Sequence, residues 1–377
     1  MSTRLNLVSP WRDDQLITAI QQQIRAYRQQ TRSAQKNANR PLKIMEVCGG
    51  QTHAIIKHGL DKLLKDEIEF LHGPGCPVCV TPIESIDDAQ ALAQQNNVIL
   101  CTFGDMLQVP GSQQTLAEIK ARGADIRIIY SPLDTLAIAR HHPDREVVLF
   151  AIGFETTAPA NAYTLAMAKQ TQLKNFSVLT SQMLTPPVIA ALLETADHSI
   201  DGFLAPGHVC TITGLKDYQH LAEHYDVPMV ITGFEPVDIL QGTLMLSQLL
   251  ADKKQGYSSR VTVEYTRSVQ MDGNPASLES IYQVFEVSNQ IWRGIGQIPK
   301  SGLKLKYEYA EFDAVKKLLR AENARHTSIK TPCGRVLKGE LKPDHCPAFG
   351  KTCTPLTPLG APMVSSEGAC SAYFQYA

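Results

Sequence analysis

The sequence has no excess of charge of either sign. Its 377 residues include 36 Lys and Arg and 37 Asp and Glu, so the formal net charge is −1. Proteins that bind nucleic acid through bulk electrostatics carry a clear positive excess. The charge balance excludes that class, although it leaves room for a local basic patch. We therefore expect no nucleic-acid partner.

Long apolar segments are also missing. The longest apolar run near the middle of the chain, residues 147–152, is far too short to span a bilayer, and residues 1–15 contain no apolar stretch typical of a secretory signal. Apolar residues make up 44% of the chain and charged residues 19%, as in soluble globular proteins of two or three domains. These features predict a cytosolic protein without a membrane partner.

The glycine motifs that bind nucleotide phosphates are absent as well. Neither Gly-x-Gly-x-x-Gly nor Gly-x4-Gly-Lys-Ser/Thr occurs. What the chain does contain is nine cysteines. In a reducing cytosol, cysteines indicate metal binding or redox chemistry more than a disulfide framework.

Short β-rich runs alternate with helical patterns after an expected polar helix at residues 11–35. The expected strands are residues 43–48, 68–71, 98–103, 126–130, 147–152, 176–180, 202–204 and 229–232. The expected helices between them are residues 53–64, 83–95, 116–122, 160–170, 188–196 and 215–224. Apolar strands that alternate with helices predict parallel sheets covered on both faces.

Two segments of this region look related. The turn Pro74-Gly75 and the strand end at Thr102 are matched about 130 residues later by Pro206-Gly207 and Thr232. A repeat of this length predicts two similar parallel-sheet α/β domains that face a cleft. The glycine-rich segments follow strands, so we expect them at the carboxyl edges of the sheets.

The pattern changes after residue 255. We expect a strand at residues 261–269 and helices at residues 277–292 and 309–324. From Thr331 onward there are six Pro, five Gly and four Cys, a composition that cannot bury an ordinary core and calls for a metal cross-link. The predicted domains are residues 1–130, 131–255 and 256–377, the last an α+β or irregular domain that holds a metal ion or an iron–sulfur cluster.

Four cysteines lie in this final region at wide and unequal spacing. Their thiolates suit either a zinc ion or an iron–sulfur cluster. The spacing matches neither a zinc ribbon nor a bacterial ferredoxin, but it is compatible with a cubane cluster. The residues are Cys333, Cys346, Cys353 and Cys370.

Cys76 and Cys79 form a Cys-x-x-Cys motif in a glycine- and proline-rich turn. Two sulfurs at this spacing can form a disulfide or one edge of a metal site, and a helix expected after Pro82 would stabilise a thiolate. No second Cys-x-x-Cys exists to complete a zinc site, so a redox role is favoured.

Cys48 and His53 bracket the segment Gly-Gly-Gln-Thr after the first expected strand. We expect Cys48 to present an exposed thiolate that acts as a nucleophile or a soft-metal ligand. A strand-end cysteine without function is the alternative. Glu155 and Glu235, in twin Gly-Phe-Glu turns, either place carboxylates at the cleft or complement helix dipoles.

Several motifs occur together in a defined order. They are Cys48-Gly-Gly-Gln-Thr-His53, His72-Gly-Pro-Gly-Cys-Pro-Val-Cys79-Val-Thr-Pro82, Thr102-Phe-Gly-Asp-Met-Leu107, Gly153-Phe-Glu-Thr-Thr-Ala-Pro159, Pro206-Gly-His208, Gly233-Phe-Glu-Pro236 and Ser366-Glu367-Gly-Ala-Cys370. Through these motifs and the four late cysteines, nearly the whole chain resembles the HypD family of NiFe-hydrogenase maturation proteins. Cys210 departs from the family's Pro-Gly-His motif, where another small residue is common, and its role is left open.

The resemblance implies a role in building the Fe(CN)2CO unit of the hydrogenase active site. HypD proteins work in complex with the small chaperone HypC and receive cyanide from the thiocyanate-bearing partner HypE. By resemblance, Cys48 holds the iron being assembled and Cys76 and Cys79 form a redox pair. A 4Fe-4S cluster is then expected on Cys333, Cys346, Cys353 and Cys370.

The implied chemistry suits these residues. Reductive cleavage of the thiocyanate S–C bond needs two electrons, which a dithiol can deliver and a cluster can replace one at a time. His53, His72 and His208 are expected to donate hydrogen bonds or to act as acid–base groups, and Glu367 to relay protons. Whether this redox-active scaffold is an enzyme is left open.

Two other functions compete with the assembly scaffold. One is an iron–sulfur-linked thiol–disulfide oxidoreductase that uses Cys76 and Cys79 and does not need Cys48. The other is a zinc-stabilised α/β binding module without a redox role.

Overall fold

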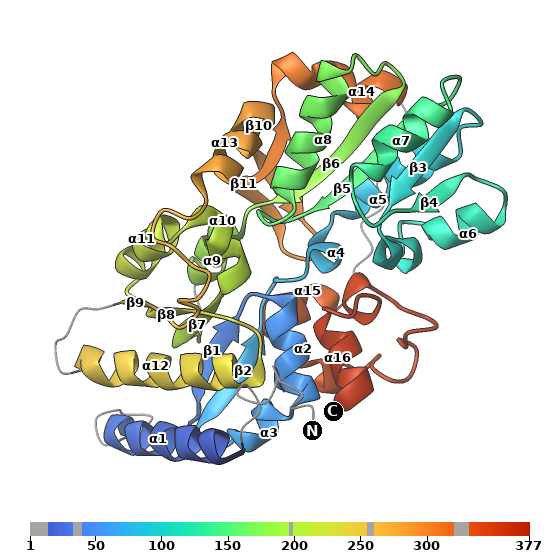
Figure 1. The fold of residues 1–377 in the computed structure, drawn as a ribbon. Coiled ribbons are helices and arrows are strands. Elements are labelled where there is room, and N and C mark those ends of the chain that lie inside the picture. The colour runs from blue at the N-terminus through green and yellow to red at the C-terminus, as the bar shows by residue number, and fades with distance from the viewer. Residues whose placement is uncertain (1–13, 33–39, 196–198, 255–259, 320–331) are drawn as a thin grey trace, which may run out of the picture.

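The structure, a computed structural model, describes residues 14–32, 40–195, 199–254, 260–319 and 332–377. It is a mixed α/β fold built on two sheets in which parallel strands dominate (Figure 1). The first sheet contains, in spatial order, β2 (Ile68–His72), β1 (Leu42–Glu46), β7 (Gly202–Pro206), β8 (Met229–Thr232) and β9 (Val261–Val263), all parallel.

The second sheet has six strands in the order β10 (Phe285–Trp292), β11 (Gly296–Leu305), β6 (Phe176–Met183), β5 (Glu146–Gly153), β3 (Val98–Thr102) and β4 (Ile126–Ile128). The last four are parallel to one another, whereas β11 runs antiparallel to both β6 and β10. Every residue of β3 and β5 is buried, because helices cover both faces of these apolar strands.

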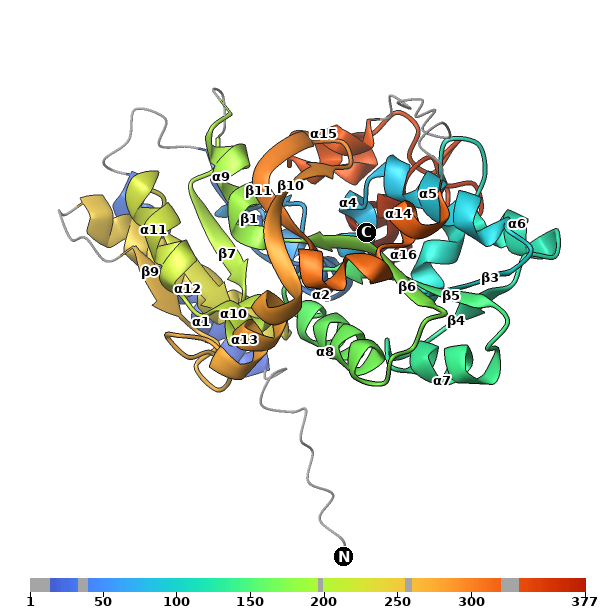
Figure 2. The ribbon, with the colours of Figure 1, turned by 90° about the horizontal axis from the view of Figure 1, so that it is seen from above.

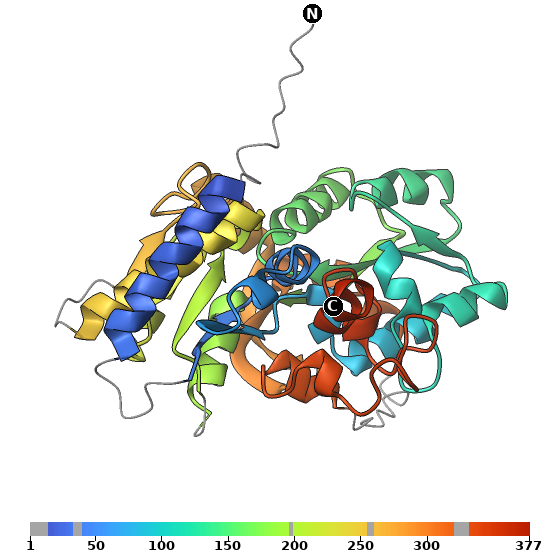
Figure 3. The same cartoon turned by 90° about the horizontal axis from the view of Figure 1, so that it is seen from below.

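Helices pack on both faces of each sheet, as the apolar strands predict. On the first sheet, one face carries α1 (Asp14–Arg32), α2 (Gly49–Lys57) and α12 (Pro236–Lys254), and the other carries α9 (Thr185–Leu193) and α11 (Lys216–His224). Figure 3 shows α1 and α12 side by side. On the second sheet, one face carries α4 (Pro77–Val80), α5 (Ile83–Ala93) and α6 (Leu116–Ala121), and the other carries α7 (Asp134–His141), α8 (Ala158–Gln170) and α13 (Pro275–Val284).

The chain passes from one sheet to the other and back. Residues 42–72 and 202–263 supply the first sheet, and residues 98–183 and 285–305 supply the second. The predicted boundary at residue 130 therefore separates strands of the same sheet, and the boundary at residue 255 separates β8 from its neighbour β9. The two Pro-Gly segments also differ in context, because β7 and β8 are paired neighbours whereas β2 and β3 belong to different sheets.

Three predictions for the region after residue 255 need correction. The helix expected at residues 277–292 is wrong: α13 ends at Val284, and residues 285–292 form β10, which pairs with β11 in a long curved hairpin (Figure 2). The strand expected at residues 261–269 is limited to β9. The helix expected at residues 309–324 is broken into η3 (Tyr307–Phe312) and α14 (Ala314–Leu318), and residues 320–324 lie outside the described part.

The C-terminal region is built from short elements, which are α15 (Cys333–Leu337), η5 (Pro343–His345), η6 (Ala361–Met363) and α16 (Ala369–Tyr376). Its own apolar cluster is small and contains Val336, Cys353, Met363 and Cys370. Helix α16 packs against α2 of the first sheet (Figure 3). In the described ranges no helix has the length and apolarity that a membrane crossing requires.

The carboxyl ends of β1, β2, β7 and β8 meet at one edge of the first sheet, because these strands are parallel. The short helix α10 (Gly207–Thr213) follows β7 at this edge, whereas α3 (Leu60–Leu63) precedes β2 and lies at the opposite edge. At the second sheet, η2 (Gly104–Gln108) follows β3. The edge of the first sheet brings together segments that the sequence singled out.

Candidate functional site

Cys48 lies two residues after β1 and is the residue that precedes the first turn of α2. Its side chain makes no cap hydrogen bond, but the nearby backbone amides of Gln51 and Gly50 favour the charged form of the sulfur. The Gln51 side chain in turn donates to the carbonyl oxygens of Ala205, Thr232 and Gly233 at 3.2–3.3 Å, which ties α2 to the ends of β7 and β8.

The Cys48 thiol is buried, with 2% of its surface exposed, so the expected exposed thiolate is wrong. Burial raises its pKa strongly, and the charges of Glu46 and Glu367 raise it further, against the opposing effect of the α2 amides. Without a bound metal, Cys48 is therefore a neutral thiol at neutral pH.

A buried glutamate that the sequence interpretation missed organises this site. Glu46 is fully buried, and its carboxylate accepts hydrogen bonds from the Cys48 backbone amide at 2.9 Å, from the Thr52 hydroxyl and from Nδ1 of His72 at 2.8 Å. Nε2 of His72 lies 3.3 Å from the hydroxyl of Tyr373 on α16. His72 therefore links the C-terminal helix to the Cys48 segment and does not face the thiol directly.

His208 and Phe234 lie beside the Cys48 sulfur. Nδ1 of His208 is 3.7 Å from Sγ of Cys48, and burial lowers the pKa of His208 to about 4, so its imidazole is neutral at neutral pH. The rings of His208 and Phe234 are 6.2 Å apart, and Phe234 remains 39% exposed. The second Gly-Phe-Glu turn thus contributes its phenylalanine to the site, at the solvent side of the thiol.

Cys76 and Cys79 form a disulfide, with their Cα atoms 5.2 Å apart. Cys76 precedes α4, and its sulfur accepts a hydrogen bond from the amide of Cys79 at 3.1 Å. The exposed fractions are 4% for Cys76 and 0% for Cys79, so the pair is buried. The Cys-x-x-Cys motif is therefore a disulfide in this structure.

The disulfide segment touches the Cys48 segment through Gly75. The amide of Gly49 donates to the carbonyl oxygen of Gly75 at 3.0 Å. A Cβ atom on Gly75 would lie 2.1 Å from the backbone nitrogen of Cys48, a distance at which no side chain fits. Glycine at position 75 is what lets the thiol and the disulfide approach each other.

His53 and Glu367 join α2 to the segment before α16. Nδ1 of His53 lies 3.2 Å from the carbonyl oxygen of Ser366, and its ring meets Tyr376 edge-on at 5.3 Å. A Cβ on Gly49 would lie 2.4 Å from Cβ of Glu367, so this segment is packed directly on the start of α2. Partial desolvation raises the pKa of Glu367, and the charge of Asp105 raises it further.

The four late cysteines are neighbours. Burial raises the pKa of Cys370, and the charges of Cys333, Cys353 and Cys346 raise it further. Cys353 and Cys370 are buried, while Cys333 and Cys346 are half-buried. Across the described ranges, no three His, Cys, Asp or Glu side chains are arranged to hold a single metal ion.

Arg293, at the turn between β10 and β11, contacts the disulfide segment and lies close enough to Cys333 to be affected by its charge. Its amide donates to the carbonyl oxygen of Val80 at 2.9 Å, directly after Cys79. Burial lowers the pKa of its guanidinium, and the charge of Cys333 opposes this effect. Its Nη1 atom is buried without a hydrogen-bond partner. No sequence motif pointed to Arg293.

Two further predicted features lie away from this group. Glu155 of the first Gly-Phe-Glu turn is buried and accepts hydrogen bonds from the Thr185 amide at 2.7 Å and the Thr185 hydroxyl at 2.9 Å, so it complements the N-terminus of α9. Cys101 and Cys210 are buried free thiols in the packed interior of the two sheets.

Comparison with known proteins gives consistent matches over the chain. The sequence model of the HypD family, described as "Hydrogenase formation hypA family", matches residues 19–377. The hydrogenase maturation factor HypD of Escherichia coli K12 is 46% identical over 358 residues, which cover 95% of each chain. HypD2 of Bradyrhizobium diazoefficiens is 46% identical over 351 residues and 91% of each chain, and HypD of Rhodobacter capsulatus is 45% identical over 344 residues and 90% of each chain.

Fold and site define a class of α/β protein in which the segment of a buried thiol contacts the segment of a disulfide, and four further cysteines lie near one another in the C-terminal region. The family comparison makes the assignment specific. The chain belongs to the HypD family, as its motifs predicted.

Proposed function

We propose that this protein is a hydrogenase maturation factor that assembles the Fe(CN)2CO unit, acting as scaffold and redox catalyst. In this proposal it works in complex with a HypC-type chaperone and receives cyanide from a HypE-type donor. The family membership supports the general role. The observation that carries the specific role is the direct contact between the Cys48 segment and the disulfide segment at Gly75.

In the proposed mechanism, Cys48 binds the iron that is being assembled, which is the substrate. Low-spin iron with cyanide and carbonyl ligands favours a soft thiolate. The neutral imidazole of His208, 3.7 Å from the sulfur, is placed to relay the thiol proton to solvent when iron binds, since a group with a pKa of about 4 does not retain it. Glu46 fixes the Cys48 backbone through its hydrogen bond, so the sulfur is held beside His208.

Cys76 and Cys79 supply the electron pair for cyanide transfer. The reduced pair and a thiocyanate-bearing donor, R–S–C≡N, yield R–SH, cyanide, one proton and the Cys76–Cys79 disulfide. The S–C bond breaks, the S–S bond forms, and two electrons pass from the two thiols to the donor. The structure holds the oxidised product of this step.

The four late cysteines fit a 4Fe-4S cluster. A 4Fe-4S cluster is larger than a single metal ion, so its four thiolate ligands lie further apart than the ligands of one ion. The four late cysteines are close enough to affect the pKa of Cys370, yet in the described ranges no three ligand side chains converge on one point. The buried, unpartnered Nη1 of Arg293 suits a neighbouring anionic group. When bound, such a cluster supplies single electrons near the disulfide. Cys333, Cys346, Cys353 and Cys370 would hold it.

A free-standing thiol–disulfide oxidoreductase is less well supported. The Cys76–Cys79 segment contacts the Cys48 segment, and an enzyme that uses only the Cys76–Cys79 pair would not require that contact.

The test is infrared spectroscopy of the protein purified anaerobically with its two proposed partners. Replacing Cys48 with Ser should abolish the cyanide and carbonyl bands, because the iron loses its thiolate, while the visible absorption of the cluster remains. Cys101→Ser is the matched control, since Cys101 is another buried free thiol, and it should retain both signals. Bands that persist in Cys48→Ser, or a cluster lost from that variant, would contradict the assignment.

A further inference from the structure

A cavity of about 320 Å3 lies apart from the thiol site, between α9, α11, α13 and the β10–β11 hairpin. It shares no lining residue with that site. Apolar side chains form most of its wall, among them Leu184, Pro186, Leu278 and Leu303. Small-molecule sites have this character, with apolar walls and a few polar groups that fix orientation.

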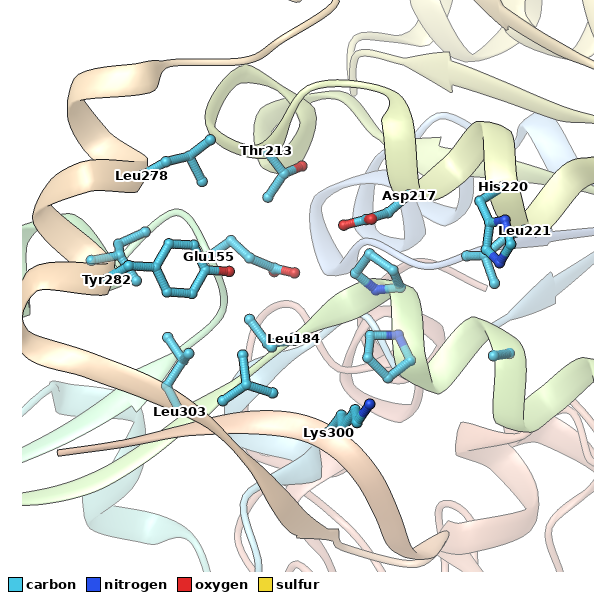
Figure 4. Close-up of a pocket in the computed structure, with 15 residues that line it drawn as sticks. Glu155, Leu184, Thr213, Asp217, His220, Leu221, Leu278, Tyr282, Lys300 and Leu303 are labelled. Carbon is cyan, nitrogen blue, oxygen red and sulfur yellow. The ribbon is translucent and has the colours of Figure 1, made fainter. Parts of the chain in front are cut away.

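Three polar groups converge inside the cavity. The carboxylates of Glu155 and Asp217 and the hydroxyl of Tyr282 point toward one another in Figure 4. They come from three elements, the turn after β5, α11 and α13. Burial and the charge of Asp217 raise the pKa of Glu155, and burial and the charges of both acids raise the pKa of Tyr282. The arrangement gives the apolar cavity one strongly polar position.

Within the described part of the chain, the two acids at this position have no cationic partner, although Thr185 donates two hydrogen bonds to Glu155. No ion pair found in the described ranges includes Glu155 or Asp217. Burial raises the pKa of Glu155 to about 7, and the charge of Asp217 raises it as well. Lys300 also lines the cavity, but in the described ranges it forms no ion pair with either carboxylate.

We propose that this cavity binds a small organic amine in its protonated form, with an apolar body against the wall and the ammonium between Glu155, Asp217 and Tyr282. An ammonium offers three donors to the two carboxylates and the phenol oxygen. It also replaces the repulsion between two carboxylates with attraction. The two carboxylates would repel an anion, and a neutral molecule would leave them without a cationic partner. This inference is independent of the proposed function.

The probes are three ligands of equal chain length, namely hexylamine, hexan-1-ol and hexanoate, titrated calorimetrically into the full-length protein at pH 7.5 and low salt. The proposal expects hexylamine to bind at least tenfold more tightly than hexan-1-ol, and hexanoate to show no binding. Equal affinity for amine and alcohol, tighter binding of hexanoate, or no binding of hexylamine would overturn it.

Variants locate the binding. Asp217→Asn should weaken hexylamine binding three- to tenfold, and Ala190→Phe, which fills the cavity, should abolish it. Lys300→Met should strengthen it, because a competing positive charge is removed. Glu223→Gln is the control on the same helix but outside the cavity lining, and its affinity should equal that of the wild type. Unchanged binding in both Asp217→Asn and Ala190→Phe would place the amine elsewhere and reject the site.

Discussion

Glu155 shows at the scale of one residue how burial and hydrogen bonding oppose each other. Its carboxylate is 3% exposed and accepts two hydrogen bonds from Thr185, yet burial outweighs them and sets the pKa near 7. The folded protein therefore binds a proton at Glu155 at pH values where the unfolded chain has lost it.

This shift predicts a pH dependence of stability. Because the pKa of Glu155 is raised on folding, its contribution is fully present below the ordinary pKa of a glutamate and is lost as the pH rises toward 7. The free energy of unfolding should fall over that interval by an amount on the order of a few kcal/mol. Glu155→Gln should make the free energy of unfolding depend less on pH over this interval.

The measurement is urea unfolding at several pH values between 5 and 8, followed by tryptophan fluorescence. The chain has two tryptophans, and Trp292 stacks on Phe154 beside Glu155, so a Trp11→Phe background makes the signal local. Glu223→Gln, which alters an exposed glutamate, should keep the wild-type slope. The prediction would be contradicted if the free energy of unfolding of Glu155→Gln fell with pH as steeply as that of the wild type.

The Cys76–Cys79 disulfide was predictable at this scale from the spacing of its two residues, whereas the roles of the other cysteines stay predictions. The expected exposed state of Cys48 was wrong because exposure depends on segments more than 100 residues away, including His208 and Phe234. Glu46 was missed since one acidic residue at a strand end ordinarily faces solvent. It is buried here because β1 lies inside the sheet between β2 and β7.

At the scale of elements, the start of α2 and the segment before α4 depend on one close contact. A Cβ at Gly75 would lie 2.1 Å from the nitrogen of Cys48 and 2.2 Å from the carbonyl carbon of Val47. Both neighbours are backbone atoms, so the clash cannot be relieved by a side-chain rotation.

Gly75→Ala should therefore destabilise the protein by about 3 kcal/mol, the upper part of the range for overpacked sites, and separate Cys48 from the disulfide. Urea unfolding measures the first effect, and the infrared bands of the assembled iron unit measure the second. Gly104→Ala is the matched control, because a Cβ there meets nothing within 4 Å. If the two variants are equally stable, the close approach at Gly75 does not exist.

Most strands and helices of the first 250 residues were predictable because apolar strands and amphipathic helices alternate clearly there. Residues 285–292 were not predictable as a strand, because β10 follows α13 without a turn. The apolar residues at 281 and 284 of α13 and at 285 of β10 have helical spacing, which hides the boundary. Pairing with β11, which begins only four residues later, decides in favour of the strand.

For the whole molecule, the proposed cluster predicts a defined metal content. Protein purified anaerobically should contain about four iron and four sulfide per chain, with iron beyond four bound at Cys48. Cys333→Ser should lower iron and sulfide together, whereas Cys210→Ser, which changes a buried thiol of the first sheet, should leave both unchanged. Zinc near one per chain without sulfide would favour the zinc-stabilised binding module instead.

The presence of parallel sheets was predictable, but the membership of each sheet was not. Local patterns identify a strand without identifying its neighbour, and here β1 pairs with β7, about 160 residues later in the chain. The strand order is fixed by long-range packing of apolar faces, which one sequence does not display.

This interleaving of the two sheets has a consequence for synthesis on the ribosome. The strand that precedes Cys48 is made early, but its partner β7 emerges much later, and Tyr373, which contacts His72, is made almost last. The nascent chain therefore carries Cys48, Cys76 and Cys79 in an unenclosed state until nearly the whole protein has been translated. Under the proposed function, iron loading would be a step for the completed chain, and a polypeptide cut short before its last helix would expose its thiols to the cell without the enclosure that protects them.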